Sequence, residues 1–135
     1  MPGVNRGSIE FVTLSLLRVA TGLTFLYHGA QKLFGAFGGI DGHGASAHLV
    51  SPLGVAGTIE SLGAVLIIAG FFTRPTAFIL SGEMAFIYYR HHARGIWPVF
   101  SGGAEIAILC CFILLFFCTV DAGPWSLDRV IRRRT

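Results

Sequence analysis

Four apolar segments alternate with shorter polar stretches along the chain, and this pattern predicts four helices that cross a membrane. The segments cover residues 9–34, 53–72, 74–92 and 103–120. Because an α-helix rises about 1.5 Å per residue, a segment of about 20 residues spans a hydrocarbon core of about 30 Å. The first segment is too long for the apolar core of a signal peptide, so we expect it to be retained. The pattern therefore predicts an all-α, multi-pass chain.

The chain is expected to form one domain, residues 1–135, folded as an integral membrane four-helix bundle. The sequence has no internal repeat, low-complexity run or domain boundary. Four crossings place both termini on the same side, and the positive-inside rule puts the more basic side in the cytoplasm. The N- and C-termini are therefore predicted to lie on the cytoplasmic side. The basic residues there would be Arg6, Arg74, Arg129, Arg132, Arg133 and Arg134, against Lys32, Arg90 and Arg94 on the opposite side.

The connecting stretches have features that suit a membrane surface. Residues 37–52 form a glycine-rich loop with Asp41 and two histidines, and we expect this loop to lie along the membrane as a partial cap. The tail after residue 120 contains a Gly-Pro turn and Trp125, while Trp97 precedes the last apolar segment. Tryptophan is enriched at membrane interfaces, so both side chains are predicted to lie there.

Composition supports a membrane protein. Hydrophobic residues make up 53% of the chain and charged residues only 13%. Basic residues gather after the last apolar segment, where they orient a membrane protein and meet anionic lipid headgroups. The lipid bilayer is therefore the expected partner, and nucleic acid is not. Cys110, Cys111 and Cys118 lie in one apolar segment without C-x-x-C spacing, which favours buried thiols over a disulfide.

Ionisable residues inside the apolar segments are the candidate chemistry, because each is expensive in hydrocarbon and needs a partner. The first segment carries Arg18, His28 and Lys32, and each later segment carries one glutamate. Counting depth along each helix predicts a cytoplasmic-side pair of Arg18 with Glu83 and an outer-side pair of His28 with Glu105. Glu60 lies between the two pairs, and Lys32 is expected to reach the outer interface. The predicted polar stripe of the first helix contains Arg18, Gly22, Phe25, Gly29 and Lys32, with His28 at its edge.

Two interpretations of these residues stay open. In one, they are structural ion pairs that fix helix register, as we expect for Arg18 and Glu83. In the other, they line a pocket that holds a proton, accepts a hydrogen bond from a quinol or binds a cation. The candidate ligand-binding residues are His28, Lys32, Glu60 and Glu105. No H-x-x-H or E-x-x-H spacing supports a metal site, so none is predicted.

The combination of motifs resembles the DoxX family of small bacterial membrane proteins. The matching stretches are LLRVATGLTFLYHGAQKLFG, IESLGAVLIIAGFFTRPTA, GEMAFIYY, GGAEIAIL and GPWSLD. The resemblance implies a four-helix protein of the bacterial cytoplasmic (inner) membrane, in a family whose members are often labelled oxidoreductases. Some members are associated with oxidative or thiol stress through complexes with soluble partners. Six residues fall on the recurring polar sites of the family: Arg18, His28, Lys32, Glu60, Glu83 and Glu105.

The resemblance and the buried residues lead to two main hypotheses. The first is a redox-associated membrane subunit that binds a quinone or a similar small molecule and works with other membrane or soluble redox proteins. The alternative is a non-enzymatic accessory or scaffold subunit of a larger membrane complex. A third, a conduit for protons or small molecules, requires a homo-oligomer because four helices leave little room for a pore. The sequence does not decide whether the chain is an enzyme.

Overall fold

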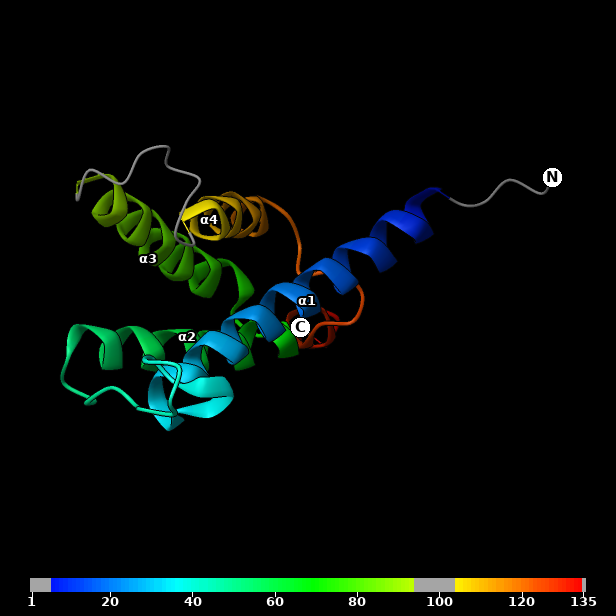
Figure 1. Cartoon of the computed structure of the whole chain (residues 1–135). Coiled ribbons are helices and arrows are strands. Elements are labelled where there is room, and N and C mark those ends of the chain that lie inside the picture. The colour runs from blue at the N-terminus through cyan, green and yellow to red at the C-terminus, as the bar shows by residue number, and fades with distance from the viewer. Residues whose placement is uncertain (1–5, 94–103, 135) are drawn as a thin grey trace. The chain divides into compact units, whose positions relative to one another are not determined.

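The computed structural model describes residues 6–93 and 104–134, which are mostly helical and contain no strand. The chain divides into two compact units, Met1–Thr73 with Ala122–Thr135, and Arg74–Asp121. The predicted helical class is confirmed for the described residues. Trp97, Arg94 and the first residue of the predicted segment 103–120 lie outside them. The helices are α1 (Arg6–Phe34), the 3₁₀ helix η1 (Ala36–Gly38), α2 (Pro52–Ala69), α3 (Thr73–Ala93), α4 (Ala104–Thr119) and α5 (Leu127–Arg132) (Figure 1).

Helices α1 and α2 pack closely side by side in antiparallel directions, and glycine makes this possible. A Cβ at Gly22 would lie 3.2 Å from the Ala64 carbonyl oxygen, and one at Gly29 would lie 2.9 Å from the Ser61 backbone nitrogen. Gly57 likewise lies directly against the side chain of Lys32. Small residues are what helix contacts in lipid use, because they let two backbones approach. The glycines of the predicted polar stripe therefore form the contact with α2.

Both ends of α2 are closed by local sequence signals. Ser51 is the N-cap, its Oγ accepting a hydrogen bond from Gly54 N at 3.1 Å, and Pro52 occupies the first helical position. At the other end, Gly70 has φ 66°, and Phe71 N donates to Leu66 O at 3.0 Å. This pattern is a Schellman motif, in which a left-handed residue ends the helix. The connection to α3 is therefore short and fixed.

The stretch between α1 and α2 folds back on itself and docks on the end of α1. Ala47 N donates to Lys32 O at 2.7 Å, and Ile40 N donates to Ala45 O at 2.9 Å. Asp41 Oδ1 accepts from the backbone N–H groups of His43 and Ala45 at 2.8 and 3.0 Å. The stretch is thus an ordered loop over one end of the α1–α2 pair, and its position along a membrane surface stays a prediction.

The Asp41 turn is expected to be pH-sensitive. Its hydrogen bonds from Ala45 and His43 hold the pKa of the exposed Asp41 carboxyl below its ordinary 3.8. A lowered pKa in the folded state means that the turn is fully stabilised above 3.8 and loses this stabilisation as the pH falls through the lowered value. In an NMR titration, the His43 and Ala45 amide shifts should therefore move with a midpoint below 3.8. Asp41→Asn should abolish the transition, and a midpoint at or above 3.8 would contradict the assignment.

The second unit pairs α3 with α4 in antiparallel directions. Arg74 Nε donates to Cys118 O at 2.8 Å, and Ser81 Oγ donates to Cys111 O at 2.9 Å. The step from Arg74 to Ser81 is seven residues, as is the step from Cys118 back to Cys111, so the register is constant over two turns. The bond of the buried Ser81 satisfies a polar side chain with a backbone carbonyl between two apolar helices, whereas the Arg74 bond is exposed.

The tail after α4 returns to the first unit and forms the short helix α5, where the sequence predicted only a Gly-Pro turn. Ser126 is the N-cap of α5 and accepts from Arg129 N at 3.3 Å. Asp128 Oδ1 and Oδ2 accept from Phe72 N and Thr73 N at 2.9 and 3.0 Å. Figure 1 shows α5 in red beside α1. The tail thereby supplies acceptors to the first N–H groups of α3.

Among the residues that the structure describes, two helices are long and apolar enough to cross a membrane, Gly7–Phe34 and Pro52–Ala69, and Ala104–Thr119 is a shorter apolar helix. Only 28% and 33% of the two candidate spans is buried inside the structure. A core helix of a soluble protein is mostly covered, whereas a lipid-facing helix leaves large apolar side chains outside. Leu23, Leu62 and Phe112 are examples of such exposed side chains.

Candidate functional site

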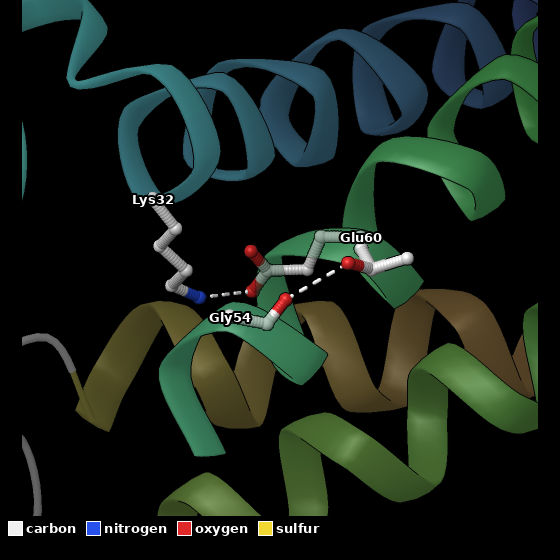
Figure 2. A network of polar contacts seen from close by, with 4 residues as sticks. Lys32, Gly54 and Glu60 are labelled. Carbon is white, nitrogen blue, oxygen red and sulfur yellow. Dashed lines mark hydrogen bonds and ion pairs between the residues drawn. The ribbon is translucent and has the colours of Figure 1, made fainter. Parts of the chain in front are cut away.

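A buried ion pair joins α1 and α2 in the first unit. Lys32 Nζ lies 2.5 Å from Glu60 Oε1, and the two side chains are 16% and 2% exposed. Figure 2 shows the Lys32 side chain crossing from α1 to the Glu60 carboxylate beside Gly54. Charge-assisted hydrogen bonds of this kind are stronger than neutral ones, and more so away from water.

The neighbouring residues explain why the two groups meet. Gly57 lies one turn before Glu60 and has no side chain, so the Lys32 stem can lie directly against α2. Thr58 Oγ1 donates to the Gly54 carbonyl at 2.9 Å and so does not compete for the carboxylate. Glu60 lies near the middle of the 18-residue helix α2. The site is therefore about 12 Å from the start of α2, at 1.5 Å per residue.

The carboxylate retains hydrogen-bonding capacity that no described residue uses. Glu60 Oε2 is buried without a hydrogen-bond partner, and so is the neighbouring Ser61 Oγ. A buried oxygen of this kind loses its water and gains nothing in return, at a cost of about 1–3 kcal/mol. One oxygen of the ion pair is therefore unused, and a second unpartnered group, the Ser61 hydroxyl, faces Gly29 of α1, so the α1–α2 contact offers an acceptor and a hydroxyl to a polar ligand group.

The structure pairs Lys32 with a residue on the neighbouring helix, while its predicted reach to the outer interface stays a prediction. Its ammonium group binds Glu60, on the neighbouring helix. The lysine stem is long and flexible, so its ammonium group can reach an opposite charge on the facing helix. The depth of Lys32 along α1 therefore did not predict that its partner is Glu60.

The other candidate ligand residues have different surroundings. His28 lies one turn before Lys32 on the same side of α1, half-buried, with its ring edge-on to Tyr27 at 5.3 Å between centroids. Glu105 lies exposed on α4, in the second unit. The structure thus brings Lys32 and Glu60 together, while a site that includes Glu105 stays a prediction. In the described ranges 6–93 and 104–134, no group of three His, Cys, Asp or Glu is arranged to hold a metal ion.

Arg18 belongs to a second polar cluster, made with the tail. The side chain is fully buried, and Nη2 donates to the Trp125 carbonyl at 2.5 Å. Gly70 leaves room for the guanidinium, because a Cβ there would overlap Arg18 Nη1. Asp128 adds a favourable opposite charge to this cluster. Glu83 lies on α3 in the second unit, so its predicted pairing with Arg18 stays a prediction.

Sequence reasoning missed the tail residues as partners of Arg18. The contact goes to a backbone carbonyl, which every residue carries and no side-chain pattern marks. A signal was available in the motif GPWSLD, whose Ser126 and Asp128 are typical of helix caps. The sequence analysis paired Arg18 with Glu83 and assigned no helix to this capping motif, so the two were not connected.

The part of the chain that carries the Lys32–Glu60 pair matches a known protein family. The DoxX family model matches residues 13–93, which is more than half of the chain and includes both Lys32 and Glu60. The chain belongs to the DoxX family. This DoxX protein is also similar to an uncharacterized protein of Haemophilus influenzae, with 38% identity over 120 residues, 85% of this chain and 87% of that protein. No solved structure matches it. Family and apolar helices together indicate a membrane protein.

Proposed function

We propose that this DoxX protein is a redox-associated subunit that binds a quinone, or a small molecule with similar polar groups, at the Lys32–Glu60 site. One observation carries the proposal: the buried Glu60 Oε2 has no partner among the described residues, although the other oxygen is held by Lys32. Ionisable residues inside a membrane are functional candidates by default. Here the pair has a free acceptor and sits in an apolar helix pair.

The chemistry of the site fits both redox forms of such a ligand. A quinone presents carbonyl oxygens, which accept hydrogen bonds from the Lys32 ammonium and the Ser61 hydroxyl. A quinol presents hydroxyl groups, which donate to Glu60 Oε2. His28, one turn away on α1, is both a donor and an acceptor when neutral. In this proposal the protein binds the ligand through His28, Lys32, Glu60 and Ser61.

We further propose the membrane arrangement predicted from the sequence, a four-helix bundle in the bacterial cytoplasmic membrane with both termini in the cytoplasm. The support is the element order, with α1 antiparallel to α2 and α3 antiparallel to α4. An even number of crossings returns the chain to its starting side. The arginines at positions 129 and 132–134 favour the cytoplasm for that side.

Quinone binding is tested with the full chain reconstituted in lipid nanodiscs. We expect ubiquinone-1 to bind, as measured by quenching of tryptophan fluorescence. Lys32→Met/Glu60→Leu removes both charges together and should weaken binding at least tenfold, because the ligand loses its donor and its acceptor. The double change avoids leaving one buried charge alone, which would destabilise the fold.

The matched control for this experiment is Arg90→Gln, which removes one exposed charge from α3 and should leave binding unchanged. Equal binding by the wild type and the double variant would contradict the site. No binding of ubiquinone-1 or a menaquinone analogue to the wild type would contradict quinone as the ligand. If a partner protein then co-purified in mild detergent, the accessory-subunit alternative would be favoured instead.

A further inference from the structure

Helix α5 has an apolar stripe and a basic stripe on opposite sides. Leu127, Val130 and Ile131 follow the i, i+3, i+4 spacing of one helix face, and each is about half exposed. Arg129, Arg132 and Arg133 have the same spacing, shifted by two residues. At 100° per residue, a shift of two residues moves a side chain to the other side of the helix. This division is typical of helices that lie in the plane of a membrane interface.

The structure holds this short helix in a fixed position. Ser126 caps it, Asp128 N donates to the Gly70 carbonyl at 2.9 Å, and Arg129 lies over the Phe11 ring at 5.6 Å from its centroid. A six-residue helix is marginal alone in water, so these contacts are what order it. They place α5 at the turn between α2 and α3, where the chain passes from one apolar helix to the next. Such a turn lies near a membrane surface in a protein that crosses the bilayer.

We propose that α5 and the arginines after it bind the surface of an anionic phospholipid leaflet. The apolar stripe enters the boundary between headgroups and acyl chains, and Arg133 and Arg134, both exposed, bind lipid phosphates. Trp125 precedes the helix and is 59% exposed, as an interfacial aromatic residue is. This proposal does not depend on quinone binding at the Lys32–Glu60 site.

The size of the surface favours lipid over a second protein copy. A stable protein interface buries about 800 Å² on each partner and about 20–30 residues. The apolar stripe of α5 has three residues, which is far less. A bilayer needs no such area, because a few apolar side chains and several arginines together hold a segment that is already tethered to transmembrane helices.

The test measures which lipid surrounds Trp125. The full chain carries Trp97→Phe, which leaves Trp125 as its single tryptophan, and is reconstituted in phosphatidylcholine bilayers. Brominated phosphatidylglycerol or brominated phosphatidylcholine is then added as a quencher. We expect phosphatidylglycerol to quench Trp125 at lower mole fraction. Arg133→Gln/Arg134→Gln should reduce this preference by about fivefold for each arginine removed, and high salt should reduce it in the wild type.

Arg90→Gln, at the other end of α3, is the matched loss of an exposed arginine and should leave the preference unchanged. Equal quenching by the two lipids in the wild type would overturn the proposal, as would an unchanged preference in the double-arginine variant. Ile131→Asn separates the alternatives. Weaker quenching by both lipids supports membrane insertion of the stripe, whereas a change from dimer to monomer with unchanged quenching assigns the stripe to a second copy.

Discussion

Lys32→Met is expected to lower the free energy of unfolding by about 3–5 kcal/mol. The variant leaves the Glu60 carboxylate 2% exposed and without its counter-charge. Removing one partner of a buried ion pair is costly because the remaining charge stays desolvated. The measurement is detergent-induced unfolding in mixed micelles, followed by circular dichroism.

The double variant Lys32→Met/Glu60→Leu shows whether the lost stability of Lys32→Met comes from the unpaired Glu60 charge or from lost packing around the lysine stem. Replacing both charges by apolar groups of similar size is often neutral or stabilising, so most of the lost stability should return. The difference between the single and double variants then measures the coupling of the two residues. If the double variant is as unstable as Lys32→Met, the loss comes from packing around the lysine stem, and the assigned role of the pair is wrong.

Gly70→Ala is expected to lower the free energy of unfolding by about 2–5 kcal/mol for two reasons. The residue has φ 66°, a left-handed conformation that costs an L-amino acid roughly 1–2 kcal/mol. Its new Cβ would also overlap Arg18 Nη1 and lie close to Ser126 Cβ, so the arginine would have to leave the Trp125 carbonyl. Forcing an extra methyl group into a packed site adds about 1–3 kcal/mol.

Gly82→Ala is the matched control, because it adds the same methyl group at a glycine with nothing within 4 Å of the new atom. Gly82 lies inside α3, where alanine is the better helix former by roughly 0.5–1 kcal/mol, so this variant should be neutral or more stable. The same unfolding measurement compares the two. Equal stability of the Gly70 and Gly82 variants would show that the Arg18 cluster does not hold the tail in place.

The sequence predicted those features that depend on periodicity within one helix. The stripe with Gly22 and Gly29 follows from a regular spacing of small residues, and it forms the contact with α2. Partners across helices were harder, since counting depth from separate helix ends ignores how far a long side chain reaches. Lys32 illustrates this, because its flexible stem brings the ammonium to Glu60.

Two features were not predicted from the sequence. The acceptor of Arg18 is the backbone carbonyl of Trp125, a group that no residue type encodes. Helix α5 has six residues, fewer than two turns, so a helix this short is not predicted from sequence before its contacts are known. Its existence depends on contacts with α1 and with the turn before α3, which only the folded chain supplies.

The position of these partners along the chain gives the protein a defined order of maturation. Lys32 and Glu60 are 28 residues apart, whereas Arg18 and Trp125 are 107 apart. At roughly 5–20 residues per second, the ribosome makes the partner of Lys32 about 1–6 s after the lysine, and the partner of Arg18 about 5–21 s after the arginine. The site between α1 and α2 is therefore available early in synthesis. The cluster around Arg18 closes only after the fourth helix has been made, as the last step of assembly.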